Sequence, residues 1–314
     1  MSVQTSSSSS LVPNVELHNG VKMPIIGLGT WEVNQSPQCE QCIFNAIEIG
    51  YRHIDTACIY RNEKLIGQVL KQCIFESPQK QHSENTHHSK LNREDLFITS
   101  KLPPTRVQSE DIIRETFMTS LEELQLSYLD CYLIHWPGTS KLKVTSDQNR
   151  LNRIATWRVL EKLYREGKTR SIGVSNFTYQ HMIELLEDIQ SREDGIIPHV
   201  NQIEYHPLLY KTHAQLEDLC KQHSIIIQAY SPLAHGELMQ GKYGQVTSRE
   251  CLQWILQRGH VILPRSIKRN HLEENFKAVT DWASNIIEDQ SRLKRLDQLV
   301  ENEVRICWNP ETIK

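Results

Sequence analysis

The sequence contains the stretch Gly50-Tyr51-Arg52-His53-Ile54-Asp55-Thr56-Ala57-Cys58-Ile59-Tyr60, which begins as a mostly apolar, β-rich run and ends in a polar, aromatic loop. The pattern predicts a buried strand that stops on a carboxylate, with a phenol five residues further on. Two later stretches repeat it: residues 96–102 carry Lys101 near their end, and residues 129–137 run out at His135 and Trp136. Each predicted strand therefore ends on an ionisable group.

The rest of the chain alternates strand-like and helix-like runs in the same way. The predicted strands are 25–30, 51–55, 96–102, 128–136, 169–175, 199–204, 225–230 and 261–264. The predicted helices open at Ser36-Pro37, with Ser36 as the cap, and then cover 62–75, 109–126, 153–166, 180–189, 213–223, 248–257 and 271–279. Eight such units predict a (β/α)8 TIM barrel in the α/β class.

An open, doubly wound sheet is the alternative fold. It should carry a Gly-x-Gly-x-x-Gly turn after its first strand, and Gly27-Leu28-Gly29-Thr30-Trp31-Glu32 lacks the third glycine. The barrel is therefore favoured.

Two segments precede the predicted barrel. Residues 1–12 are rich in serine and are expected to form a disordered tail. Residues 15–24 predict a β-hairpin about Asn19-Gly20, with the two positive φ angles of a type I′ turn. Residues 13–314 are expected to form a single domain.

The composition limits the classes of partner. With 314 residues and a net charge of −3, the chain gives no electrostatic reason to expect nucleic acid or an anionic membrane as a partner. No apolar run approaches the roughly 20 residues of a membrane-spanning helix. The first ten residues do not have the form of a secretory signal, so the eight cysteines are expected to be reduced thiols and the protein to be cytoplasmic.

Asp55, Tyr60, Lys101 and His135 would meet at one rim of the barrel, where strands run out into loops. A Lys cation about 4 Å from a phenol could lower the phenol pKa by up to about three units. Asp55 would hold Lys101, and a neutral His135 would orient a carbonyl oxygen. Each group by itself could be structural, but together they predict an acid–base site. Since these side chains supply no hydride, a nicotinamide cofactor is required.

Other rim residues suit such a cofactor, although each has a structural alternative. Ser175, Asn176 and Gln202 could contact a carboxamide or could cap helices and satisfy backbone groups. Tyr230 could stack on the nicotinamide ring or could belong to the core.

At these residues the sequence resembles the aldo-keto reductase family. The motifs are Gly-Leu-Gly-Thr-Trp (27–31), Gly-Tyr-Arg-His-Ile-Asp-Thr-Ala (50–57), Ser-Lys-Leu (100–102), Leu-Ile-His-Trp-Pro (133–137), Gly-Val-Ser-Asn-Phe (173–177), Asn-Gln-Ile-Glu-Tyr-His-Pro (201–207), Ala-Tyr-Ser-Pro-Leu (229–233) and Leu-Pro-Arg-Ser (263–266). The resemblance implies a monomeric barrel that binds NADPH or NADP+ and reduces aldehydes or ketones, with Tyr60 as general acid.

The resemblance also implies roles for single residues. It places the carboxamide against Ser175, Asn176 and Gln202 and the ring on Tyr230. The remaining expected cofactor contacts are Gly29, Thr30, Asp55, Ser231, Leu233, Arg265, Ser266, His271, Glu274 and Asn275. The substrate is expected to meet Tyr60 and His135 between walls formed by Trp31 and Trp136. Trp308 could complete this wall or could have a packing role instead.

Three features depart from the family pattern. Arg265 and His271 stand where the family usually has Lys and Arg, which predicts a preference for NADPH with a weakened grip on its 2′-phosphate. Residues 234–246 form a shorter loop than usual, which predicts fast cofactor release. Residues 76–92 form a longer segment, expected on the face opposite the site; a solvated loop is favoured there over a metal site made of His82, His87 and His88.

Two further alternatives remain. Cys39 and Cys42 have zinc-like spacing but no second pair, so no metal is predicted there. Some members of the family are regulatory or structural barrels with little turnover, and this chain could be one of them. The four acid–base residues favour the enzyme.

Overall fold

The structure, a computed structural model, describes residues 12–75, 91–107, 109–287, 289–299 and 303–314. Eight parallel strands follow one another in sheet order: β3 (Leu28–Gly29), β4 (His53–Asp55), β5 (Phe97–Leu102), β6 (Cys131–Ile134), β7 (Ile172–Ser175), β8 (Val200–Glu204), β9 (Ile226–Tyr230) and β10 (Val261–Leu263). The backbone N–H of Gly27 donates to Ile262 O at 2.9 Å, and that of Gly29 donates to Pro264 O at 3.1 Å. These bonds join the two ends of the sheet, so the predicted barrel is confirmed.

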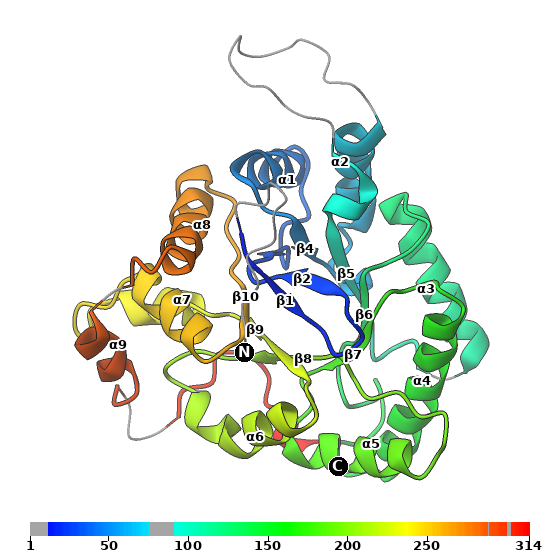
Figure 1. The fold of residues 1–314 in the computed structure, drawn as a ribbon. Coiled ribbons are helices and arrows are strands. Elements are labelled where there is room, and N and C mark those ends of the chain that lie inside the picture. Colours follow the sequence, from blue (N-terminus) through cyan, green and yellow to red (C-terminus); the bar gives the residue numbers. More distant parts are fainter. Residues whose placement is uncertain (1–11, 76–90, 108, 288, 300–302) are drawn as a thin grey trace.

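Helices form a ring outside the strands (Figure 1). They are α1 (Gln38–Ile49), α2 (Glu63–Phe75), α3 (Glu110–Leu124), α4 (Gln148–Arg165), α5 (Tyr179–Gln190), α6 (Ala214–Gln222), α7 (Ser248–Gln257) and α8 (Arg269–Ala283). On α3 the side chains at helical spacing, Ile113, Phe117, Leu121 and Leu124, are all buried, as the period of the apolar residues predicts. A further helix, α9 (Gln290–Leu296), packs against α7 and was not predicted.

The N-terminal hairpin closes one end of the barrel. It is formed by β1 (Asn14–Glu16) and β2 (Lys22–Pro24) (Figure 1). Leu17, just after β1, and Met23 on β2 are buried among residues of the barrel strands, including Phe97 and Val200. The hairpin therefore covers the amino-terminal end of the barrel, opposite the carboxyl-terminal rim.

The hairpin turn differs from the prediction. Of the turn residues only Gly20 has a positive φ, 83°. The N–H of Gly20 donates to Leu17 O at 2.8 Å, and that of Leu17 donates to Val21 O at 2.9 Å. The loop thus has three residues, with glycine in the left-handed position, and it is not a type I′ turn.

Helix starts also differ in places. Helix α1 begins at Gln38, after Pro37, and Ser36 Oγ bonds the side chain of Glu40 at 2.6 Å, so the predicted Ser36 cap is wrong. Helix α4 begins five residues before the predicted position, because its first turn is polar and lacks the apolar period. The predicted tail up to residue 11, and residues 76–90 with their three histidines, lie outside the described residues. Among the helices that the structure describes, none has the length and apolar character needed to cross a membrane.

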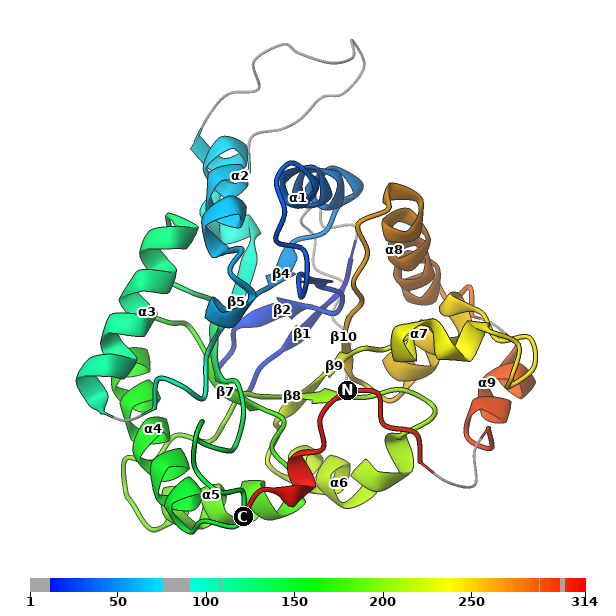
Figure 2. The same cartoon turned by 180° about the vertical axis from the view of Figure 1, so that it is seen from behind.

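The parallel register brings distant residues to one rim. Asp55 pairs with Thr99 across β4 and β5, Ser175 with Gln202 across β7 and β8, and Gln202 with Gln228 across β8 and β9. The C-terminal residues 303–314 cross this same end of the barrel, opposite the hairpin (Figure 2).

Candidate active site

Lys101 lies at the centre of the rim, fully buried in β5. Its Nζ donates to Asp55 Oδ2 at 2.6 Å, to the carbonyl oxygen of Thr56 at 2.9 Å and to the hydroxyl of Tyr60 at 3.3 Å. The buried cation is thus paired with a carboxylate and holds a phenol within hydrogen-bonding reach, as the sequence predicts for these three residues.

The loop after β4 positions Tyr60. A single 3-10 turn (Cys58–Tyr60) ends at Arg61, whose φ is 59°. Next in the chain, Asn62 accepts a hydrogen bond from Thr56 Oγ1 at 2.7 Å and donates to Thr30 O at 2.9 Å. Asn62 therefore ties the β4 loop to the β3 loop, a role that the sequence motifs did not indicate.

The surroundings of Lys101 and Tyr60 shift the pKa values of both side chains. Burial lowers the pKa of Lys101, but Asp55 and Tyr60 outweigh this effect and raise it above its usual value. For Tyr60, burial is the largest influence and raises the pKa, and it exceeds the opposing effect of Lys101. The predicted net lowering of the Tyr60 pKa is therefore wrong: desolvation of the phenolate and the nearby Asp55 charge outweigh the cation.

His135 faces Tyr60 from the end of β6. The two ring centroids are 5.6 Å apart at an angle of 71°. Burial and, to a lesser degree, the charge of Lys101 hold the pKa of His135 well below its usual value. The imidazole is therefore neutral at physiological pH, in agreement with the predicted state, and its buried Nδ1 lacks a hydrogen-bond partner among the described residues.

Amide and hydroxyl groups from β7, β8 and β9 form a connected cluster beside these residues. Asn176 Nδ2 donates to His135 O at 3.0 Å and to Ser175 Oγ at 3.1 Å, and Asn176 Oδ1 accepts from Tyr230 OH at 2.7 Å. Gln202 Nε2 donates to Asp55 Oδ1 at 2.7 Å. The structure therefore brings together the predicted carboxamide residues, Tyr230 and the acid–base group.

Gln228 completes this cluster, and sequence reasoning missed it. Its Oε1 accepts the second hydrogen of Gln202 Nε2 at 2.8 Å, and it is fully buried. The available signal was a polar residue in the middle of the otherwise apolar run 225–230.

The cluster fits the amide of a nicotinamide. Both hydrogens of Gln202 Nε2 are engaged by Asp55 and Gln228, so its Oε1 is the atom left to accept an N–H from a ligand. Asn176 Nδ2 can likewise exchange its hydrogen bond to Ser175 Oγ for one to the carbonyl oxygen of a ligand. One acceptor and one donor are what a carboxamide needs.

Further predicted contacts lie outward from this cluster. Ser231 and Leu233 follow β9, where Ser231 has a φ of 48°. On the β3 side, Thr30 is buried and its Oγ1 donates to Asp55 O at 2.9 Å. A Cβ at Gly29 would lie 3.1 Å from Leu263 O, so the close approach of these two strands favours glycine there.

The predicted adenosine-end residues surround the start of α8. Arg265 is exposed and pairs with Glu32 at 2.8 Å, and His271 and Glu274 are exposed on the helix. Ser266 is half-buried, while Asn275 is buried. An exposed ion pair contributes little free energy, so Arg265 can exchange Glu32 for a phosphate.

Of the three predicted wall tryptophans, one follows β3, one follows β6 and one lies in the C-terminal segment. Trp31 contacts Tyr60 edge to face, with ring centroids 5.0 Å apart. Trp136 lies 6.0 Å from Trp308, which is 81% exposed. The predicted wall residues therefore lie in two pairs, one of which includes the C-terminal segment.

Known proteins resemble this chain in sequence and fold. Residues 25–250 match the family model described as "Aldo/keto reductase family". The chain is 40% identical to a glyoxal reductase from Bacillus subtilis, over 97% of this chain and 99% of that protein. It is 36% identical to a 9,11-endoperoxide prostaglandin H2 reductase from Trypanosoma cruzi, over 95% and 94%.

The fold comparison agrees. A solved aldo-keto reductase from a Medee basin deep-sea metagenome library superimposes with a TM-score of 0.75 and is 32% identical, over 94% of this chain and 98% of that one. The match to the family model and these nearly full-length similarities show that the chain belongs to the aldo/keto reductase family.

Proposed function

We propose that this chain is an NADPH-dependent reductase of aldehydes and ketones, with Tyr60 as its general acid. Family membership and relatives named as reductases support carbonyl reduction with a nicotinamide cofactor. The observation that carries the assignment of Tyr60 is the contact of its hydroxyl with Lys101 Nζ at 3.3 Å, next to a neutral His135.

The side chains divide the reaction among them. A bound nicotinamide supplies the hydride that the carbonyl carbon accepts. Tyr60 donates its hydroxyl proton to the carbonyl oxygen, and Lys101 stabilises the phenolate that remains. The neutral imidazole of His135 orients the same oxygen by a hydrogen bond. Asp55 keeps Lys101 charged and in place, because an unpaired buried ammonium would tend to lose its proton.

The test is the oxidation of NADPH in the presence of glyoxal, the substrate in the name of the Bacillus relative. We expect Tyr60→Phe to lower kcat by about 10²- to 10⁴-fold, the usual contribution of a general acid. The variant should still bind NADPH, as measured by the quenching of protein fluorescence. The matched control is Tyr164→Phe, which removes a phenol hydroxyl that bonds Asn19 in the hairpin, and it should keep full activity.

Two results would contradict the proposal. Tyr60→Phe with the activity of the unmodified protein would remove Tyr60 from the mechanism. Absence of turnover in the unmodified protein with glyoxal and other small aldehydes, despite tight NADPH binding, would favour a cofactor-binding regulatory barrel.

We also propose that residues 13–314 form one domain that acts as a cytoplasmic monomer. The closed barrel with its ring of helices supports the single domain. Light scattering coupled to gel filtration should give the mass of one chain, and cell fractionation should recover the protein with cytoplasmic markers. A dimer mass or recovery in another compartment would contradict the respective statement.

A further inference from the structure

The C-terminal segment from Val304 to Lys314 crosses the carboxyl-terminal rim (Figure 2). It enters at Val304, whose N–H donates to Leu208 O at 2.9 Å. At its other end Lys314 N donates to Val144 O at 2.7 Å, Ile313 O lies 2.8 Å from His181 Nε2, and Arg153 donates to Lys314 O at 3.0 Å. We call residues 304–314 the C-terminal strap.

One buried carboxylate holds the near end of the strap. Glu204, the last residue of β8, is 2% exposed. Its Oε1 accepts the N–H of Ile306 at 2.7 Å, and its Oε2 accepts that of Cys307 at 3.1 Å. His206 Nε2 lies 2.9 Å from Oε1 as a further partner. Burial raises the pKa of Glu204, but His206 and the two backbone N–H groups outweigh burial and hold it below the usual value, so the clamp is charge-assisted.

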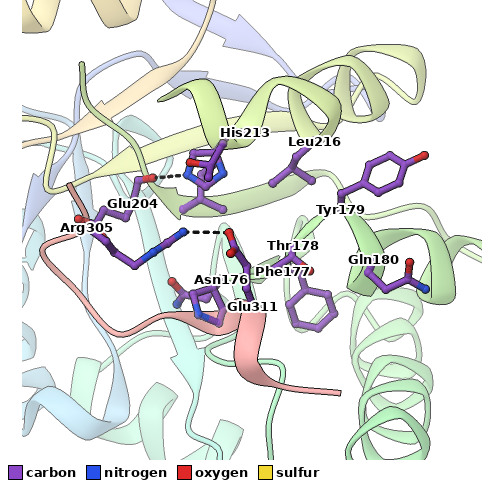
Figure 3. Close-up of a pocket in the computed structure, with 13 residues that line it drawn as sticks. Asn176, Phe177, Thr178, Tyr179, Gln180, Glu204, His213, Leu216, Arg305 and Glu311 are labelled. Carbon is purple, nitrogen blue, oxygen red and sulfur yellow. Dashed lines mark hydrogen bonds and ion pairs between the residues drawn. The ribbon is translucent and has the colours of Figure 1, made fainter. Parts of the chain in front are cut away.

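A hollow separates part of the strap from the barrel. A pocket of about 220 Å³ lies between the strap and the barrel, lined by Asn176, His213, Leu216 and others. Figure 3 shows Arg305 and Glu311 of the strap among the residues that line this pocket, joined by an ion pair of 3.0 Å that is partly solvated. The strap therefore borders a hollow between its two ends, while Val304 and Ile306 pack against the hydrophobic core.

The clamped part of the strap and the residue after it reach the candidate site. Cys307 Sγ lies 3.7 Å from Ser231 Oγ, and the Trp308 ring lies 6.0 Å from that of Trp136, a predicted substrate-wall residue. Glu204 is two residues beyond Gln202 on β8, so both side chains point to the same side of the strand. One strand thus carries the amide of the candidate cofactor site and the clamp of the strap.

We propose that Glu204 is a positioning residue that sets the substrate opening by fixing the backbone of Ile306 and Cys307. Glu204 acts through the strap and does not touch the reacting atoms. The kinetic part of this inference depends on the proposed reductase function; the clamp itself does not.

The first measurement is amide hydrogen exchange in the resting protein. Glu204→Gln exchanges one charged acceptor oxygen for a donor, so the amides of Ile306 and Cys307 should exchange about tenfold faster or more. Glu204→Asp keeps the charge but is one methylene shorter, and it should also speed exchange. The control is Glu217→Gln on α6, whose carboxylate accepts Tyr205 OH at 2.8 Å; it should leave both amides unchanged.

The second measurement is a double-mutant cycle in steady-state kinetics. Glu204→Gln should raise KM for the carbonyl substrate several-fold, to about that of a chain truncated after Arg305, with little change in kcat. In the truncated chain Glu204→Gln should have no further effect, because the groups it held are gone.

The outcomes separate the two claims. Unchanged exchange at Ile306 and Cys307, or additive effects of Glu204→Gln and truncation on KM, would overturn the positioning role. Faster exchange together with no carbonyl reduction by the unmodified protein would overturn the proposed function and support the clamp.

Discussion

Glu63 shows how strongly one buried residue can respond to its surroundings. The side chain is 1% exposed at the start of α2 and accepts hydrogen bonds from Ser100 Oγ at 2.5 Å and Ser120 Oγ at 3.0 Å. Burial raises the pKa of Glu63 to about 7, although the two hydroxyls oppose the shift. Ser100 precedes Lys101, so this carboxyl group lies directly behind the candidate site.

The raised pKa predicts a pH-dependent stability. Between pH 4.5, the usual pKa of a glutamate side chain, and about pH 7, the folded protein keeps a proton that the unfolded chain has lost. The free energy of unfolding should therefore fall as pH rises through this window, by up to about 3 kcal/mol. Glu63→Gln cannot ionise and should remove this fall. Urea unfolding at pH 5, 6, 7 and 8 would measure the free energy of unfolding of both proteins. An equal change of this free energy with pH in the unmodified protein and in Glu63→Gln would contradict the prediction.

At the scale of elements, the neighbouring strands β8 and β9 orient the amide of Gln202. Their register places Gln202 opposite Gln228. The Gln228 carbonyl takes one amide hydrogen of Gln202, and Asp55 takes the other. The strand pairing therefore decides which atom of Gln202 can face a ligand.

We expect Gln228→Met to disturb this arrangement while preserving side-chain length. One hydrogen of Gln202 would lose its acceptor, at a cost of about 1–3 kcal/mol in the free energy of unfolding. The affinity for NADPH should also fall, because Gln202 could then turn its amide. Urea unfolding and NADPH titration would measure both effects. A stability loss with unchanged NADPH affinity would show that Gln228 only supports the barrel.

At the scale of the whole molecule, the hairpin covers one end of the barrel and the C-terminal segment crosses the other (Figures 1 and 2). Around the open rim the candidate acid–base group lies near β4, β5 and β6, whereas Arg265 and His271 lie beyond β10. A dinucleotide reaching both would therefore cross the rim.

This layout predicts the choice of cofactor. Arg265 can release Glu32 and bind a 2′-phosphate, and His271 lies exposed on α8 beyond it. We expect KM to be about tenfold lower for NADPH than for NADH, corresponding to one charge-assisted contact. Arg265→Met should reduce the difference, and Arg269→Met, which removes a cation paired with Glu273, serves as the control. Equal KM values for the two cofactors in the unmodified protein would contradict the prediction.

Local patterns in the sequence determined the sequence of strands and helices and the polar residues at the strand ends. The apolar faces of α3 and the buried run of β5 are set by helix and strand periods, which are properties of neighbouring residues. Once eight parallel units are recognised, Asp55, Lys101 and His135 must lie at the same rim. A polar first turn, as in α4, carries no such period, so the predicted start of that helix lies several residues after the observed one.

Only the tertiary structure decided which atoms meet and what environment they share. Gln202 bonds Asp55 across 147 residues of sequence, and Glu204 holds backbone N–H groups about one hundred residues away. The direction of the Tyr60 pKa likewise followed from burial, which outweighed Lys101. Desolvation and long-range contacts depend on the complete packing of the barrel and the strap, and no local pattern encodes them.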